Sequence, residues 1–174
     1  MMGQVTVPGF EGMQLAEVFR VLDVLAEAGV AAWLEGGWGV DALVGRQTRA
    51  HRDIDIDVVQ EAVALAALHE LGYKVETDWR PNRVELAATR RGWVDLHPLL
   101  FDLDGTARQP GLNGEFYDFP KSYFVTGQLA GRAVQCFSHE AQRHFHTGYD
   151  LRRIDTHDLA QLDLLANPST RSSH

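Results

Sequence analysis

Apolar residues recur every three or four positions in several parts of this chain, which is the spacing of an amphipathic helix. The most regular stripe of leucines and valines ends at Gly29, and a second segment, rich in alanine and leucine, ends at Gly72. Ser138 and Asp155 are suited to cap two later helices. Helices are therefore predicted over residues 13–28, 38–44, 60–71, 139–146 and 155–165.

Other segments alternate between apolar and polar residues, as half-buried strands do. The clearest runs from Asp53 to Val58, where the aspartates share one face and the β-branched residues share the other. Strands are also predicted over residues 30–34 and 73–79, hairpins over residues 83–97 and 128–137, and turns over residues 101–105 and 109–114.

The predicted hairpin over residues 83–97 gathers ionisable residues on one face. Its apolar residues share the opposite face only if the connecting loop has an odd number of residues. A three-residue loop would place Glu85 opposite His97, and a five-residue loop would place it opposite Asp95. With either loop, two acids and a histidine lie together on the polar face.

The composition fits a globular protein of one domain, with 174 residues, 45% of them hydrophobic and 23% charged. The net charge of −8 argues against a nucleic-acid duplex as a partner and favours a cationic small molecule. No apolar run reaches about 18 residues and no leader-like segment is present, so we expect a cytoplasmic protein with no membrane partner. The single cysteine, Cys136, is expected to be a buried, inert thiol.

The acidic face of residues 53–58 suggests metal chemistry. Asp53, Asp55 and Asp57 recur at every second position, so adjacent carboxylates lie about 6.6 Å apart and repel one another. Mg²⁺ would remove that repulsion, and it binds oxygen ligands together with substrate phosphates. We predict Asp53 and Asp55 as metal ligands and Asp95 as the third. Asp57 lies further along the strand, and an equally good interpretation makes it a solvated acid at the strand end.

A glycine pair precedes the acidic strand by about one short helix. Gly36 and Gly37 follow a buried strand and open a helix, where backbone amides and the helix N-terminus can bind phosphates. Arg49 and His51, between the two features, are candidates to contact a triphosphate. Two glycines alone more often form a plain turn, so their significance comes from the neighbouring aspartates.

The polar face of the hairpin supplies candidates for proton transfer and ligand contact. Asp95 or Glu85 could accept a proton from an attacking hydroxyl group. His97 is a candidate supporting residue at the substrate site, or else a core histidine before Pro98. Trp93 shares this face and is the aromatic residue predicted to contact a ligand. The histidines after residue 138 lack the spacing of a zinc site.

Together, these motifs resemble those of a known enzyme family. The glycine pair, the Asp-x-Asp strand and Asp95 resemble the pattern of polymerase-β-type nucleotidyltransferases. Longer segments are similar to the small lincosamide nucleotidyltransferases, antibiotic-resistance enzymes that are related to aminoglycoside 2''-adenylyltransferases. The similarity extends from about residue 15 to residue 162. The segments that carry it are Trp33–Leu43, His51–Asp57, Val94–Pro98 and His146–Asp150.

The resemblance implies an α+β protein with the polymerase-β-like nucleotidyltransferase fold, a mixed β-sheet flanked by helices. Residues 1–166 would form one nucleotidyltransferase domain, followed by a disordered tail over residues 167–174. The family transfers AMP from ATP to a drug hydroxyl group with Mg²⁺ and releases pyrophosphate. Its members often act as homodimers, although this sequence shows no interface. Its metal ligands and phosphate-facing glycines match Asp53, Asp55, Asp95, Gly36 and Gly37.

Our leading hypothesis is therefore a Mg²⁺-dependent adenylyltransferase whose partners are ATP and a small antibiotic, in the first place a lincosamide. A close alternative keeps this chemistry with an aminoglycoside as the acceptor. An alternative of another class is an antitoxin-like nucleotidyltransferase that modifies or merely binds a protein. A third is a nucleotide-binding module without turnover, against which the complete set of carboxylates argues.

Overall fold

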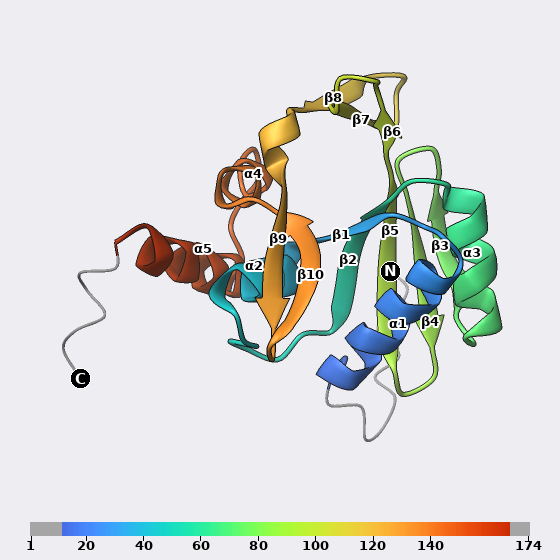
Figure 1. Ribbon diagram of the computed structural model, residues 1–174, viewed down its shortest axis with the longest axis horizontal. Helices are drawn as coiled ribbons and strands as arrows, with labels where there is room; N and C mark the ends of the chain where they lie inside the picture. The colour runs from blue at the N-terminus through green and yellow to red at the C-terminus, as the bar shows by residue number, and fades with distance from the viewer. Residues whose placement is uncertain (1–11, 168–174) are drawn as a thin grey trace.

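The computed structural model describes residues 12–167 and shows a seven-stranded β-sheet with helices packed beside it (Figure 1). The strand order is β3-β4-β5-β2-β1-β10-β9. These strands are β1 (Ala32–Glu35), β2 (Asp53–Val58), β3 (Lys74–Trp79), β4 (Arg83–Ala88), β5 (Gly92–Pro98), β9 (Phe124–Leu129) and β10 (Arg132–Phe137). The helices are α1 (Leu15–Glu27), α2 (Gly36–Val44), α3 (Glu61–Glu70), α4 (His139–Phe145) and α5 (Arg153–Ala166), with one 3₁₀ turn, η1 (Lys121–Tyr123).

Parallel and antiparallel pairing are mixed in this sheet. β2 runs parallel to β5, and β1 runs parallel to β10, whereas the other neighbours are antiparallel. The second parallel pair joins the two halves of the chain, because it sets Leu34 beside Cys136. The predicted α+β fold with a mixed sheet flanked by helices is confirmed.

The alternation in β2 decides which face of the sheet is covered by α1 and α3. Ile54, Ile56 and Val58 are fully buried in one apolar cluster with residues of these helices, such as Val21 and Leu68. Burying each of these side chains stabilises the fold by about 1.5–3 kcal/mol. The aspartates of β2 consequently face the other side, where α2, α4 and α5 pack together (Figure 1).

The predicted helices are all present, with shifted ends. α2 begins at Gly36, so the glycine pair lies in its first turn rather than before it. α5 begins at Arg153, because Asp155 does not cap it from outside but accepts the backbone N–H of Arg152 from within the first turn, at 2.9 Å. Ser138 caps α4 as predicted.

The strands show two further differences from prediction. Glu85 lies opposite Asp95, the partner predicted for a five-residue loop, but Ala88 and Gly92 also pair, so that three residues connect β4 and β5. The segment predicted as turns contains a second sheet of three strands, of two to four residues each, which are too short to show alternation in the sequence. They are β6 (Leu100–Phe101), β7 (Ala107–Pro110) and β8 (Phe116–Phe119).

Cys136 is buried as predicted, and burial raises the pKa of its thiol to about 12. Within residues 12–167, no helix combines the length and the apolar character needed to cross a lipid bilayer. Of the tail predicted over residues 167–174, residues 168–174 lie outside the described part of the chain.

Candidate active site

Four carboxylates form a row across four neighbouring strands. Asp55 on β2 lies between its two ladder partners, Glu35 on β1 and Asp95 on β5, and Glu85 on β4 pairs in turn with Asp95. Side chains at paired positions share a face and lie about 5 Å apart, so the row concentrates negative charge there. The predicted meeting of acids from β2, β4 and β5 is confirmed, whereas Glu35 was not predicted from the sequence.

This crowding disfavours the ionised carboxylates. Burial and the charge of Asp55 raise the pKa of Asp53 to about 7. Burial also raises the pKa of Asp55, with a further contribution from the charge of Asp95, although a hydrogen bond from His97 opposes the shift. Burial raises the pKa of Glu85 in the same direction. One oxygen of Asp95, Oδ1, is buried without a hydrogen-bond partner among the described residues. A divalent cation fits this donor set, because it would satisfy the lone oxygen and offset the repulsion.

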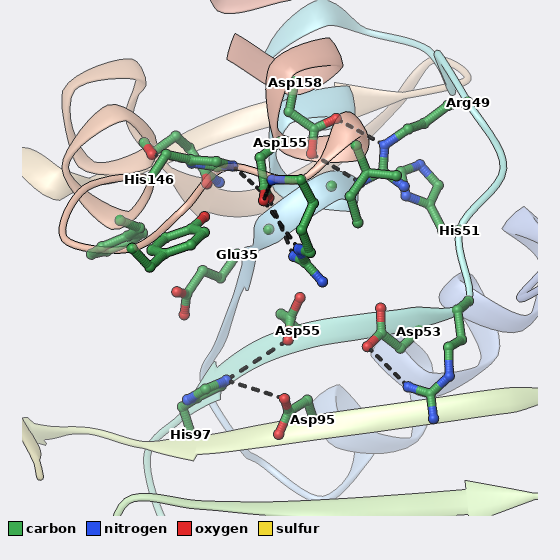
Figure 2. Close-up of a pocket in the computed structure, with 18 of the residues that line it drawn as sticks. Glu35, Arg49, His51, Asp53, Asp55, Asp95, His97, His146, Asp155 and Asp158 are labelled. Carbon is green, nitrogen blue, oxygen red and sulfur yellow. Dashed lines mark hydrogen bonds and ion pairs between the residues drawn. The ribbon is translucent and has the colours of Figure 1, made fainter. Parts of the chain in front are cut away.

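His97 lies close to both central carboxylates of the row. Its Nε2 lies 3.8 Å from Asp55 and 4.0 Å from Asp95 (Figure 2). Burial lowers the pKa of His97, but the surrounding carboxylates outweigh it and raise the pKa to about 9. The side-chain amide of Gln109 lies 3.1 Å from Nδ1 and holds the ring. His97 is therefore part of the site rather than an isolated core histidine.

Asp57 is not a solvated acid at the strand end. It is fully buried, and neither carboxylate oxygen has a hydrogen-bond partner among residues 12–167. Burial and the carboxylate of Glu35 raise the pKa of Asp57 well above its ordinary value. The row of aspartates on β2 therefore extends past the cavity. Asp53 and Asp55 line the cavity, whereas Asp57 is enclosed in the protein interior.

The glycine pair is packed against the ionisable residues of the site. Gly36 has a φ of +61°, and an added Cβ would collide with the carboxylate of Asp55. A Cβ on Gly37 would lie 2.5 Å from Nδ1 of His51 and would also collide with Arg49. Only glycines therefore fit here, and their backbone amides lie at the N-terminus of α2, beside the acidic row.

His51 is held by a buried partner. Its Nε2 lies 2.5 Å from Oδ2 of Asp41, and both side chains are almost completely buried. The hydroxyl group of Thr48 donates to the other oxygen of Asp41 at 2.5 Å, and the ring of Trp38 packs on the imidazole with centroids 4.3 Å apart. These contacts fix the imidazole with Nδ1 directed toward Gly37.

Helix α5 completes the wall opposite the acidic strand. Arg49, predicted to contact phosphate, forms two hydrogen bonds with Asp158, at 2.9 and 2.8 Å. Asp155 binds Arg152 and lies 3.8 Å from Nε2 of His146 (Figure 2). No local pattern could have predicted this wall, because its residues are about 100 positions away from the strand that they face.

The site surrounds a cavity of about 740 Å³. Nine of the ten residues predicted for the site line it, and Trp93 does not. The Trp93 ring instead lies under the guanidinium of Arg52, 3.9 Å from its centroid, and Nε1 donates to Glu76 at 2.7 Å. Aromatic side chains reach the cavity from the other wall, as Phe145 and Tyr149. The nine are Gly36, Gly37, Arg49, His51, Asp53, Asp55, Glu85, Asp95 and His97.

Comparison with known proteins decides the family. The family model for aminoglycoside-2''-adenylyltransferases matches residues 17–162. The chain is 40% identical to a lincosamide resistance protein of Staphylococcus haemolyticus over 148 residues, which are 84% of this chain and 92% of the relative. The chain belongs to the aminoglycoside-2''-adenylyltransferase family. The predicted membership, and with it the prediction of a nucleotidyltransferase enzyme, is confirmed.

Solved structures agree with this family membership. The lincomycin-bound crystal structure of the lincosamide antibiotic adenylyltransferase LnuA superposes with a TM-score of 0.82 at 39% identity, covering 87% of this chain and 98% of LnuA. ANT(2'')-Ia, in complex with adenylyl-2''-tobramycin, shares the fold, with a TM-score of 0.68 at 21% identity and coverage of 89% of this chain and 90% of that one. An Escherichia coli 2''-aminoglycoside nucleotidyltransferase is 40% identical over only 43 residues, 25% of this chain and 24% of that relative.

Proposed function

We propose that this enzyme transfers AMP from ATP to a hydroxyl group of a lincosamide antibiotic. The observation that carries the proposal is the row of carboxylates beside a glycine turn that opens a helix, all at one cavity. The choice of a lincosamide is supported by the resistance protein that is 40% identical and by the superposition on lincomycin-bound LnuA.

We assign the binding of Mg²⁺ to Asp53, Asp55 and Asp95. The raised pKa values of Asp53 and Asp55 and the lone buried oxygen of Asp95 support this assignment, because each indicates carboxylates without enough positive charge nearby. When bound, Mg²⁺ supplies charge neutralisation for the phosphates and for the charge that develops in an in-line displacement. An all-oxygen donor set is the one that Mg²⁺ prefers.

The nucleotide phosphates would lie at the N-terminus of α2. The amides of Gly36 and Gly37 point out of the first turn of a nine-residue helix, whose dipole favours negative charge there. His51 presents Nδ1 to the same place. Arg49 also lines the cavity, where its guanidinium is ion-paired with Asp158. In this role Arg49 would add positive charge near the phosphates and keep its ion pair with Asp158.

The acceptor hydroxyl would attack the α-phosphorus while the bond from that phosphorus to pyrophosphate breaks, and its proton would pass to a carboxylate. Asp95 and Glu85 are both in position on neighbouring strands. Both carboxylates have an arginine partner, Arg83 for Asp95 and Arg52 for Glu85, and burial raises the pKa of Glu85, which suits a general base. Replacing each by its amide separates the two, because only loss of the base removes the acidic limb of the pH–rate profile.

The decisive assay is pyrophosphate release from ATP and Mg²⁺ with a panel of lincosamides and aminoglycosides as acceptors. We expect turnover with lincosamides and an adenylylated drug in the mass spectrum. Turnover with aminoglycosides alone would transfer the proposal to that class of acceptor. Absence of any drug product, together with adenylylation of a protein, would favour the antitoxin-like alternative. Use of ATP would place the reaction in the cytoplasm, and the homodimer stays a prediction.

A further inference from the structure

The inner end of the acidic face carries a second set of possible ligands. Glu35 on β1, Asp57 on β2 and His97 on β5 each offer one ligand atom, and the three atoms lie within 4.8 Å of one another. None of them is needed for the all-oxygen set of Asp53, Asp55 and Asp95. The two sets therefore lie side by side on one sheet face, and His97 lies between them, because its ring nitrogen is also within 4.8 Å of ligand atoms of Asp55 and Asp95.

Asp57 is the group that requires an explanation. It is fully buried, and no backbone or side-chain N–H or hydroxyl group of the described residues donates to its oxygens or to Oε2 of Glu35, so the polar group left to it there is the Glu35 carboxylate, which can hydrogen-bond with Asp57 only through a shared proton. The neighbour of Asp57 on β1, Trp33, packs on the ring of Phe124, with centroids 5.1 Å apart, so the surroundings on that side are apolar, and its neighbour on β5 is His97. An ionised carboxylate in such a place is very unfavourable unless a proton or a cation neutralises it.

We propose that Glu35, Asp57 and His97 form an inner site for a first-row divalent cation such as Mn²⁺ or Zn²⁺. Two carboxylates and one imidazole suit these ions, whereas Mg²⁺ prefers oxygen ligands throughout. His97 would release its proton on binding the ion, and the two negative charges would then balance the charge of the ion. This inference does not rest on the proposed drug or nucleotide.

The surroundings of His97 support the assignment. A histidine that binds a metal usually has its second ring nitrogen held by a partner, which fixes the ring. The amide of Gln109 contacts Nδ1 at 3.1 Å, and Nε2 is left on the side of the carboxylates. Glu35 and His97 also line the cavity, so an ion can enter from there, whereas Asp57 lies behind them.

An ion in the inner site would link β1, β2 and β5 next to the start of α2. Glu35 is the residue from which α2 starts, directly before Gly36, and an ion that fixes Glu35 would also fix the start of the glycine turn. Its loading would therefore act on the geometry of the turn without contact with any nucleotide.

The test uses protein stripped of metal with a chelator and needs no nucleotide. Mn²⁺ binding is followed by loss of the electron paramagnetic resonance signal of free Mn²⁺, in excess Mg²⁺. We expect one Mn²⁺ per chain, displaced by one equivalent of Zn²⁺. Asp57→Asn should weaken binding at least about tenfold. Asp53→Asn is the matched control, because it removes a carboxylate from the same strand face but leaves the inner site intact.

Three results would overturn the inference. They are no Mn²⁺ binding in excess Mg²⁺, unchanged binding in Asp57→Asn, and loss of binding in Asp53→Asn alone. The second would show that Glu35 and Asp57 share a proton instead, and the third would place the ion at the nucleotide site. Circular dichroism checks the fold of each variant. Should Asp57→Asn fail to fold, Glu35→Gln replaces it, because Glu35 is only partly buried and the same tenfold loss is expected.

Discussion

Gly36→Ala tests how the glycine turn and the acidic strand fit together. Gly36 has a φ of +61°, where alanine costs about 1–2 kcal/mol. The added Cβ would also lie 3.2 Å from Cγ of Asp55 and closer than 3.0 Å to Oδ2, so the carboxylate has to move away by at least about 0.5 Å. A misplacement of about 1 Å at a reacting centre can lower a rate about a hundredfold. We expect activity to fall by about 10- to 100-fold.

Gly29→Ala is the matched control. Gly29 also has a positive φ, +75°, but nothing lies within 4 Å of an added Cβ. Both variants should lose about 1–2 kcal/mol of unfolding free energy in urea denaturation. Only Gly36→Ala should lose the rate of ATP-dependent pyrophosphate release in the presence of drug. Equal activities of the two variants would refute the argument that the turn and Asp55 are in steric contact.

Three more predictions concern the charged groups. Asp53→Asn should abolish transfer and leave the circular dichroism spectrum unchanged, and loss of folding would instead indicate a structural role. Because the folded pKa of Asp53 is raised from 3.8 to about 7, its contribution to stability is present below pH 4 and is lost as the pH rises through 7. The melting temperature of metal-free protein should therefore fall between pH 5 and pH 8, Mg²⁺ should restore it at pH 8, and a flat profile would contradict the assigned crowding. Asp41→Asn removes the charged partner of His51, and since such a hydrogen bond contributes about 1.5–3 kcal/mol, KM for ATP should rise at least about tenfold in steady-state assays. An unchanged KM would remove His51 from the phosphate site.

Local sequence patterns predicted those structural features that depend on a single segment of the chain. The alternation of Asp53 to Val58 indicated both the strand and its charged face, because period two leaves no other arrangement. The apolar partners in the hairpin limited the residue opposite Glu85 to His97 or Asp95, and the structure has Asp95. The family resemblance then supplied AMP as the transferred group and a drug hydroxyl group as the acceptor, which no periodicity could name.

The parts that could not be predicted depend on neighbours distant in sequence. The sequence left open whether Asp57 is solvated, because its ladder partners Trp33 and His97 belong to β1 and β5, whose positions beside β2 no local pattern gives. Glu35 belongs to the row of carboxylates because β1 pairs with β2, and that pairing sets Glu35 beside Asp55. Trp93 shares a face with Asp95, but Arg52 covers its ring, and a contact of that kind leaves no trace in spacing.

Because β1 pairs with β10, the seven-stranded sheet can be completed only late in the synthesis of the chain. β1 keeps an unpaired edge until β10 has been synthesised, because Leu34 and Cys136 come from opposite halves of the chain. Contacts over such a sequence separation slow folding, since a long loop must close before they form. On the ribosome, the glycine turn and the acidic strand emerge well before α4 and α5. A nascent chain therefore carries most of its reactive groups without a pocket, and only a finished one can hold a nucleotide against them.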